Sequence, residues 1–360
     1  MSDIGIDRSP TSSQNDLLPA QSYMSPLDEA QHSVSTTPPI SRSMPVSDVL
    51  DILVQHGCQD VTQDIDKTTC SEYPVANGGF GDIYRGQLTS GAWVAIKCTR
   101  VIINSVVDKE QQHLACAARE LHTWSKLDHR YILKLLGVAQ YRGQIAMVSP
   151  WVERGSLFKY LEDRPRLNRP QLCMKIADGL SFLHENRVVH GDLKGANVLV
   201  SDAEEPLIAD FGNAIVHERT LQFTHSITKC NLSPRWTAPE VLAEGLCTAE
   251  ADVYALGMTI LEVITGKVPY PELKDLAVIL AVVQKRFPTR PEEHIPSAST
   301  EGDSLWQLLV QCWDFEPAAR PTAKAVKDAL ESITPEGLVY YRLLAPSSPI
   351  DDVAGPFLYI

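Results

Sequence analysis

His190-Gly191-Asp192-Leu193-Lys194-Gly195-Ala196-Asn197 is the stretch that decides how this chain is interpreted, and Asp210-Phe211-Gly212 begins thirteen residues after Asn197. Asp192 supplies a carboxylate that can orient a hydroxyl nucleophile, and Lys194 supplies a positive charge for a phosphate group. Asn197 and Asp210 supply the hard oxygen ligands that Mg²⁺ prefers. Together these residues are the parts of a site for phosphoryl transfer.

Four further motifs stand in a fixed order around this stretch. They are Val94-Ala95-Ile96-Lys97 upstream, and Ala238-Pro239-Glu240, Asp252-Val253-Tyr254-Ala255-Leu256-Gly257 and Arg320-Pro321 downstream. Each motif alone is weak, because Asp210-Phe211-Gly212 by itself fits any turn that closes a strand. The ordered set hardly arises by chance, and over residues 73–333 it resembles the eukaryotic protein kinases.

The resemblance extends to a subgroup and carries a fold with it. Gly195-Ala196-Asn197 and Arg235-Trp236-Thr237-Ala238-Pro239-Glu240 are similar to the tyrosine-kinase-like group of serine/threonine kinases. The resemblance implies an α+β, bilobal protein kinase fold, with a small β-rich N-lobe, a larger α-helical C-lobe and the site between them. It also implies ATP and Mg²⁺ as cofactors, and proteins with serine or threonine hydroxyls as substrates in intracellular signalling.

Composition agrees with this interpretation and excludes other classes of function. The 360 residues hold one catalytic domain plus tails, and a hydrophobic content of 44% supplies a packed core. Lys and Arg number 32 against 45 Asp and Glu, and the net charge of −13 argues against binding to nucleic acid or an anionic membrane. The eight cysteines form no C-x-x-C pair, and Cys98 is expected to be a reduced structural residue.

The sequence contains no recognisable targeting or membrane segment. Residues 1–5 lack a basic flank followed by an apolar run, which a secretory signal requires. The longest apolar stretch, residues 276–283, is too short to span a bilayer. We therefore expect a cytoplasmic protein, with the nucleus as the alternative.

The chain divides into four regions. Residues 1–46 are rich in Ser, Thr, Pro and Gln without apolar periodicity, so a disordered tail is expected. Residues 47–72 form a short extension, residues 73–333 the catalytic domain, and residues 334–360 an extended C-terminal tail that lies across the domain. In the first tail, Ser-Pro or Thr-Pro pairs are either targets of proline-directed kinases or parts of a solvated segment without a regulatory role. They begin at Ser9, Ser25 and Thr37.

Apolar periodicity predicts the main elements. Ser47-Asp48 precede apolar residues at helical spacing, so a short helix over residues 47–57, capped by this pair, is expected to pack on the small lobe. Strands are predicted over residues 82–86 and 93–97, on either side of a turn at residues 89–91. Helices are predicted over residues 111–127, 169–186, 248–265 and 305–312.

The resemblance assigns a nucleotide site. Residues 77–81 would form a tight turn over the phosphates, because glycine lets backbone N–H groups come close. The family's first glycine falls on Ala76, which predicts a slightly stiffer lid. The residues expected at the nucleotide are Ala76, Asn77, Gly78, Gly79, Phe80, Gly81, Ile83, Ala95, Lys97, Glu120, Ser149, Pro150, Val152 and Leu199.

Lys97 would bind the α- and β-phosphates and pair with a glutamate on a helix. A lysine at the end of an apolar strand is costly to desolvate without a charged partner. The resemblance assigns this partner to Glu120. Glu110 is the alternative partner, and a solvated helix face is the alternative role of Glu120.

The hinge is located by aligning Gly155-Ser156-Leu157 with the family pattern, which puts Ser149 at the gatekeeper position and makes Pro150-Trp151-Val152 the hinge. Pro150 lacks an N–H but keeps a carbonyl that accepts from the adenine amino group, and Val152 supplies a donating N–H. A serine gatekeeper leaves room behind the adenine. The residues expected to sandwich the ring are Ile83, Ala95 and Leu199.

The catalytic roles follow from the same resemblance. Asp192 is the catalytic base, which accepts the proton of the substrate hydroxyl or at least orients it. Lys194 neutralises the γ-phosphate during transfer, while Asn197 and Asp210 hold Mg²⁺. These four residues therefore carry the predicted chemistry.

Residues near the loop are interpreted as structural. His190 is expected to pack beneath the loop against Phe211 and not to act as an acid or base, and His184 is expected to be a satisfied core histidine. Asp252 is expected to anchor the backbone of the loop.

Gly191 departs from the family pattern, which has arginine at this position to bind a phosphorylated activation loop. With glycine, basal activity is expected not to depend strongly on loop phosphorylation, although Arg219 and Lys229 are possible substitutes. Glu240 and Arg320 are expected to form a buried ion pair that fixes the activation segment. Removing one partner of such a pair costs roughly 3–5 kcal/mol.

Two positions favour serine/threonine over tyrosine substrates. Lys194 lies two residues after the predicted base, and Ser233 falls where serine/threonine kinases have a hydroxyl that contacts this base. Trp236-Thr237 leaves dual specificity open. Ser156 and Ala196 fall where arginine-directed kinases place acidic anchors, so no strong preference for upstream arginine is expected.

Two other functions compete with an active kinase. A pseudokinase that acts as a nucleotide-binding scaffold is suggested by Ala76, Pro150, Gly191 and Asn213, but every residue of the transfer mechanism is present. A small-molecule kinase is disfavoured by the long segment between residues 212 and 238, which suits a protein substrate.

Overall fold

The computed structural model describes residues 44–78, 81–99, 121, 123–162, 164, 167–216, 233–245 and 247–338, all within one compact unit, Pro39–Ile360. Both predicted tails fall almost entirely outside this part of the chain, as do the Ser-Pro and Thr-Pro pairs. Several residues with predicted roles also lie outside the described residues. They are Gly79, Phe80, Glu110, Glu120, Arg219 and Lys229.

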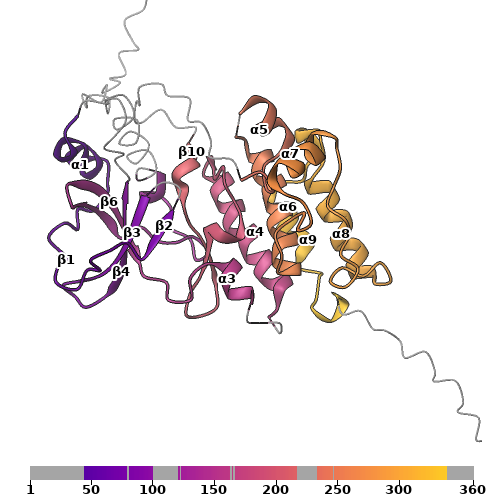
Figure 1. Ribbon diagram of the computed structural model, residues 1–360, viewed down its shortest axis with the longest axis horizontal. Helices are drawn as coiled ribbons and strands as arrows, with labels where there is room; N and C mark the ends of the chain where they lie inside the picture. Colours follow the sequence, from indigo (N-terminus) through magenta and orange to yellow (C-terminus); the bar gives the residue numbers. More distant parts are fainter. Residues whose placement is uncertain are drawn as a thin grey trace, which may run out of the picture. The chain divides into compact units, whose positions relative to one another are not determined.

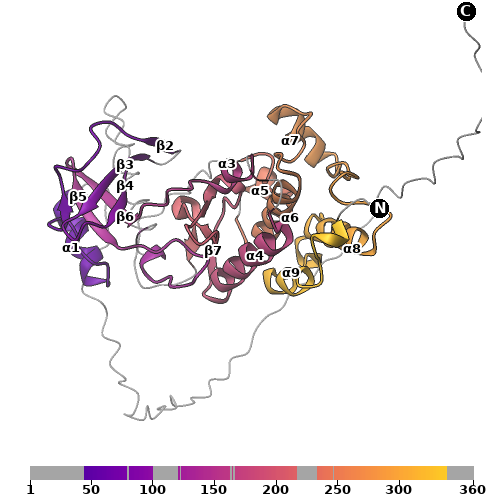
Figure 2. The same ribbon diagram turned by 90° about the horizontal axis from the view of Figure 1, so that it is seen from below.

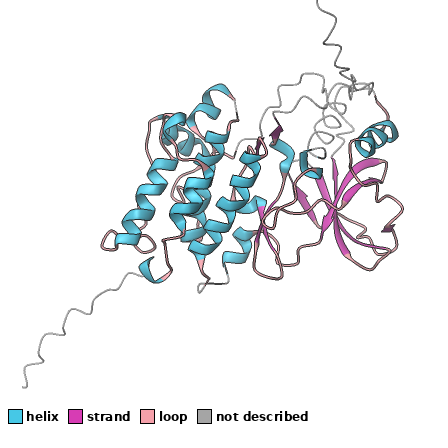
Figure 3. Ribbon diagram, turned by 180° about the vertical axis from the view of Figure 1, so that it is seen from behind, coloured by secondary structure: helices cyan, strands magenta, loops and turns pink. Residues whose placement is uncertain are grey.

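An antiparallel sheet of six strands forms the β-rich lobe. The strands are β1 (Ile65–Asp66), β2 (Ala76–Gly78), β3 (Gly81–Leu88), β4 (Trp93–Thr99), β5 (Gly137–Tyr141) and β6 (Gln144–Pro150). They pair in the order β1-β3-β4-β6-β5, with β2 also paired to β3. Figure 3 shows this sheet in magenta, apart from most of the helices. The two strands predicted from alternation are confirmed as parts of β3 and β4.

Strand β4 shows why this part of the sequence forms a buried strand. Val94, Ile96 and Cys98 alternate along it and all three are buried, since successive side chains point to opposite faces of a sheet. Burial raises the pKa of the Cys98 thiol to about 12. The thiol is therefore protonated at neutral pH, in agreement with its predicted structural role.

Helices dominate the second lobe (Figure 1). They are α3 (Leu157–Glu162), α4 (Arg169–Glu185), α5 (Pro239–Glu244), α6 (Ala249–Thr265), α7 (Asp275–Val283), α8 (Thr300–Cys312) and α9 (Ala323–Leu330). Two small two-stranded sheets accompany them, β7 (Val188–Val189) with β10 (Ile215–Val216) and β8 (Val198–Val200) with β9 (Pro206–Ile208). This arrangement confirms the predicted α+β, bilobal architecture.

Helix α6 is the most deeply buried element, and it packs against α3, α4 and α8. Every residue from 251 to 264 is buried, as expected for a helix that is apolar on all sides. Three polar side chains interrupt this apolar surface: Asp252, Thr259 and Glu262. Because buried polar groups need partners, these three mark where α6 holds other segments.

Side-chain caps define where the long helices begin. Asn168 accepts from the N–H of Gln171 at the start of α4, and Thr248 accepts from Ala251 at the start of α6. The helix predicted over residues 305–312 is longer than expected, because Ser299 caps α8 and its polar first turn extends the helix to Thr300.

The extension before the sheet contains α1 (Val46–Gln55), which packs against β5 and β6 (Figure 2). Val49 and Leu53 are fully buried there, which confirms that this helix packs on the small lobe. The predicted cap is wrong. The helix begins one residue earlier, after Pro45, so the Ser47 hydroxyl donates to Asp48 and caps nothing.

Within the part of the chain that the structure covers, none of the helices combines the length and the apolar character that a bilayer span requires.

Replacing Leu53 with alanine tests the docking of α1. Leu53 is fully buried, so the Leu53→Ala cavity is expected to lower the free energy of unfolding by about 2–5 kcal/mol. Val54, its neighbour, is 41% exposed, and Val54→Ala is the matched control, with an expected change within about 0.5 kcal/mol. Urea unfolding measures both, and equal effects would contradict the docking.

Candidate active site

Asp252 on α6 holds the start of the loop that follows β7. Its carboxylate accepts the backbone N–H of His190 at 2.7 Å and that of Gly191 at 2.8 Å. The His184 Nε2 atom lies 3.0 Å from the same carboxylate. The predicted anchoring role of Asp252 is confirmed. His184 has a partner, as expected, but it is partly exposed and not a core residue.

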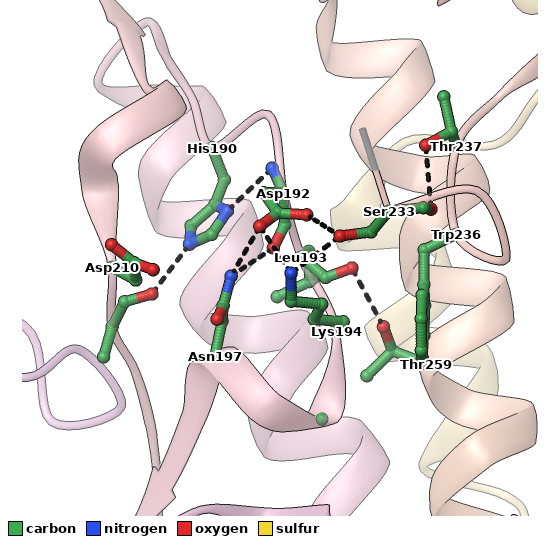
Figure 4. Close-up of polar contacts among 12 residues, drawn as sticks. His190, Asp192, Leu193, Lys194, Asn197, Asp210, Ser233, Trp236, Thr237 and Thr259 are labelled. Atoms are coloured by element: carbon green, nitrogen blue, oxygen red, sulfur yellow. Dashed lines mark hydrogen bonds and ion pairs between the residues drawn. The ribbon is translucent and has the colours of Figure 1, made fainter. Parts of the chain in front are cut away.

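Asp192 lies at the centre of a hydrogen-bond network (Figure 4). One carboxylate oxygen accepts from the Ser233 hydroxyl at 2.7 Å, and the other accepts from Lys194 Nζ at 2.7 Å. Lys194 Nζ also donates to Ser233 Oγ at 2.7 Å, while the Asn197 amide donates to the second carboxylate oxygen at 3.0 Å. The network fixes the orientation of the carboxylate and confirms the predicted contact between Ser233 and Asp192.

Asp210 pairs with the lysine of β4. Lys97 Nζ lies 2.6 Å from Asp210 Oδ1. Burial alone would raise the pKa of Asp210, but the charge and hydrogen bond of Lys97 outweigh burial and hold this pKa below its usual range. Asp210 is therefore ionised at neutral pH. The predicted partner of Lys97, Glu120, lies outside the described residues, so that pairing stays a prediction.

Phe211 is fully buried and joins two parts of the site. Its ring contacts His190, with ring centroids 5.4 Å apart, and Trp124, at 5.8 Å. His190 is itself fully buried, and its Nε2 atom lies 3.1 Å from the carbonyl oxygen of Ala209. This packing confirms the structural role predicted for His190.

The predicted adenine residues lie on the central strands and on β8. Ala95 of β4 is opposite Ser149 of β6, and Ile83 of β3 is opposite Lys97. Leu199 of β8 joins the segment after the hinge through a bridge to Ser156. Ser149 is buried, and its role as gatekeeper stays a prediction.

The hinge carries an interaction that the sequence analysis missed. Trp151 donates its backbone N–H to Trp93 and its ring N–H to Glu153, at 2.7 Å. The Arg85 guanidinium lies over the Trp93 ring, 4.1 Å from its centroid, and also bonds to Glu153 at 3.1 Å. No sequence spacing reveals this cluster, because its members come from three separate segments.

The activation segment is fixed by two arginines. Arg320, whose side chain is fully buried, makes two bonds to Glu240 at 2.6 and 2.8 Å, which confirms the predicted ion pair. Arg235 donates to the backbone carbonyls of Pro269, Tyr270 and Leu273. The role of Arg235 was not predicted, because backbone acceptors leave no signal in a sequence.

Residues 71–330 match the family model described as protein tyrosine and serine/threonine kinase. The chain belongs to the protein kinase family. The match covers both lobes of the fold and all four residues predicted to carry the chemistry.

Several kinases are similar to this chain. The serine/threonine-protein kinase STY46 of Arabidopsis thaliana is 30% identical over 270 residues, which cover 73% of this chain and 44% of the relative. A probable serine/threonine-protein kinase of Dictyostelium discoideum is 31% identical over 255 residues, 69% of this chain and 48% of the relative. The tyrosine-protein kinase SRK3 of Spongilla lacustris is 28% identical over 275 residues, covering 74% and 77%. The chain thus spans less than half the length of the first two relatives.

Gly191 and Asn213, two residues that depart from the family pattern, lie next to each other in the structure. Gly191 has a left-handed backbone with φ of 77°, and a Cβ atom there would lie 2.8 Å from the backbone oxygen of Asn213. An arginine at position 191 would therefore require Asn213 to move. Asn213 is buried, and within the described part of the chain neither polar atom of its amide has a hydrogen-bond partner.

Asn197 and Asp210 each have one side-chain oxygen that is not used in the described hydrogen bonds, and these two oxygens are expected to bind a metal ion. The Asn197 amide donates through its nitrogen, and Asp210 uses Oδ1 for Lys97. Among the bonds of the described residues, the Asn197 Oδ1 and Asp210 Oδ2 atoms are therefore not engaged. An amide oxygen and a carboxylate oxygen suit a hard cation such as Mg²⁺.

The gatekeeper assignment predicts inhibitor sensitivity. With serine at position 149, a purine analogue carrying a bulky aromatic substituent has room behind the adenine site. We expect Ser149→Met to raise the inhibitory concentration of such an analogue by roughly tenfold or more, because the longer side chain fills that space. Inhibition of ATP-dependent phosphorylation measures this, and equal sensitivity of both proteins would contradict the assignment. Retained thermal stabilisation by Mg·ATP shows that the variant is folded.

Proposed function

We propose that this kinase transfers the γ-phosphate of Mg·ATP to serine or threonine hydroxyls of proteins. The observation that carries the proposal is the network around Asp192. Its carboxylate is oriented by Ser233, Lys194 and Asn197, and the lysine is placed beside it at 2.7 Å. A rigid carboxylate with an adjacent cation is what a positioned hydroxyl nucleophile and a transferring phosphate require.

The reaction forms one bond and breaks one. The substrate hydroxyl oxygen attacks the γ-phosphorus, the bond from this phosphorus to the β–γ bridging oxygen breaks, and ADP leaves. Asp192 accepts the hydroxyl proton. Lys194 stabilises the negative charge on the transferring group, which is concentrated near its oxygens in the transition state.

The remaining residues bind the nucleotide and its metal ion. Lys97 contacts the α- and β-phosphates, and its bond to Asp210 keeps these two groups at one site. Asn197 and Asp210 would hold Mg²⁺ through their remaining oxygens. When bound, this ion supplies positive charge that offsets the charge of the phosphates.

Serine/threonine specificity is supported by Lys194 and Ser233. The Ser233 hydroxyl bonds to both Asp192 and Lys194, so it occupies the floor of the acceptor site. The names of the relatives include both serine/threonine and tyrosine kinases, but the Arabidopsis thaliana and Dictyostelium discoideum relatives described above, at 30% and 31% identity, are both named serine/threonine kinases. A scaffold without activity is disfavoured because no residue of the transfer mechanism is missing.

Replacing Asp192 with asparagine tests the proposal. Loss of the carboxylate removes the proton acceptor, so transfer of labelled phosphate from ATP to myelin basic protein is expected to fall about 10²- to 10⁴-fold. Asp202→Asn, which changes an exposed aspartate, is the control and should leave the rate unchanged. Phosphoamino-acid analysis is expected to give phosphoserine or phosphothreonine. ATP binding without any transfer by the wild-type protein would favour the scaffold.

Treating the enzyme with phosphatase tests the consequence of Gly191. Because no arginine stands at this position to bind a loop phosphate, the rate of transfer is expected to stay within about twofold after complete dephosphorylation. Mass spectrometry verifies the removal of phosphate. A rate that drops tenfold or more after dephosphorylation, and recovers on rephosphorylation, would contradict this expectation.

A further inference from the structure

Helix α6 follows the catalytic loop along its whole length, and Glu262 is the last of its three polar contacts. Asp252 binds the start of the loop. The Thr259 hydroxyl donates to the carbonyl of Ala255 at 2.8 Å and also lies 3.5 Å from the carbonyl oxygen of Leu193 (Figure 4). One turn further, Glu262 Oε2 accepts the backbone N–H of Gly195 at 2.9 Å. Glu262 is only 1% exposed, although its side chain carries an ionisable carboxyl.

Glu262 differs from the other two contacts because it also binds the activation segment. The same Oε2 atom accepts from the ring N–H of Trp236 at 3.0 Å. Gly195 directly follows Lys194, and Trp236 lies three residues after Ser233. Lys194 and Ser233 are the residues that bond to Asp192. One carboxylate oxygen therefore joins the two segments that orient the catalytic base.

The fit around this carboxylate is close. A Cβ atom at position 195 would lie 2.8 Å from the Glu262 carboxyl carbon and from Oε1. A glycine is needed here for the loop to approach Glu262 at hydrogen-bond distance. A displacement of the Glu262 carboxylate therefore displaces the catalytic loop at Gly195, and with it the neighbouring Lys194.

We propose that Glu262 is a positioning residue of the transfer site, which holds the catalytic loop and the activation segment in register through Gly195 and Trp236. The inference rests on the proposed function. The described bonds of Glu262 are to Gly195 and Trp236, so it acts on the reaction through the neighbouring Lys194 and Ser233.

The charge state of Glu262 should control the strength of its hydrogen bonds to Gly195 and Trp236. Burial raises the pKa of Glu262 to about 7, while its bonds from Gly195 and Trp236, and the charge of Lys194, act in the opposite direction. Two further cations lie near this end of α6: Arg169 of α4, which donates to the carbonyls of Val263 and Ile264, and Lys267, which follows the helix. An ionised acceptor binds N–H donors about twice as strongly as a neutral one. The hydrogen bonds from Gly195 and Trp236 to Glu262 are therefore stronger above pH 7 than below it.

Activity and stability should depend on pH in opposite directions. The pKa of Glu262 is higher in the folded protein than in the unfolded chain, so its contribution to stability is fully present below the unfolded value of 4.5 and is lost as pH rises through about 7. The transfer rate, in contrast, rises as the carboxylate ionises. A residue with a merely structural role would change both in the same direction.

Glu262→Gln separates these effects. The amide keeps the shape and one acceptor but does not titrate. For the wild-type enzyme we expect kcat to fall about tenfold from about pH 8 to about pH 6, because the ionised fraction falls about tenfold per pH unit below the pKa. The rate of the variant should be low and nearly independent of pH. The ratio of the wild-type rate to the variant rate therefore falls from about ten at about pH 8 towards one at about pH 6. This ratio cancels any titration that the two proteins share, including that of the nucleotide.

Trp236→Phe is the second variant, and it keeps the aromatic ring while removing one donor to Glu262. Losing a bond to the ionised form raises the pKa of Glu262, so the acid limb of the rate profile should move to higher pH by a few tenths of a unit or more. Thr259→Val is the matched control on the same helix and loop. It removes the hydroxyl that contacts the carbonyls of Ala255 and Leu193 without removing a titrating group, so its acid limb should coincide with that of the wild type.

Thermal melts of the same proteins complete the test without relying on activity. Relative to the wild type, Glu262→Gln should gain melting temperature at about pH 8 and lose this gain towards pH 6. An unchanged acid limb in Glu262→Gln, or in Trp236→Phe if the first variant does not fold, would overturn the proposal. Wild-type enzyme that transfers no phosphate at any pH would instead overturn the proposed function, while the melts still report on Glu262.

Discussion

The buried carboxylate of Asp252 accepts two consecutive backbone N–H groups of the catalytic loop, at 2.7 and 2.8 Å, and the rest of the site is built on that contact. An unpaired N–H in this dry setting would cost about 1–3 kcal/mol, so the loop has little freedom to leave α6. With His190 and Gly191 held, Asp192 faces Ser233 and Lys194. Helix α6 thereby fixes the position of the Asp192 carboxylate, for which we propose the catalytic role.

The packing of Phe211 extends this constraint from the helical lobe towards the sheet. Its ring lies between His190 and Trp124, and the aspartate before it binds Lys97 of β4. The charge of Lys97 keeps Asp210 ionised in spite of burial, which matters because only the carboxylate form binds a divalent cation. Charge thus joins the apolar strand β4 to Asp210, and packing joins the next residue, Phe211, to the loop that α6 holds.

The two departures at Gly191 and Asn213 form one structural feature. The left-handed backbone at position 191 has no steric cost for glycine, whereas another residue would be strained by about 1–3 kcal/mol. The space that an arginine would need is occupied by the backbone of Asn213. A kinase with this pair lacks the arginine that the family has directly before the predicted base. Among the described residues, Arg235, Arg320 and Glu262 anchor its activation segment.

The sequence determined the lobes, the order of the motifs and the identity of the four chemical residues, because strand and helix periods and short motifs are local properties. It located β4 as a strand next to the turn at residues 89–91, and α6 from its apolar periodicity over residues 248–265. It placed the start of α1 one residue too late. The Ser47 hydroxyl donates to the Asp48 side chain and not to a helix N–H group, and the helix begins after Pro45. Only the tertiary structure decided that Arg235 binds backbone carbonyls and that Glu262 joins Gly195 to Trp236. These contacts link residues from 26 to 67 positions apart in the chain or end on backbone atoms, and burial gives them their strength, so no local pattern encodes them.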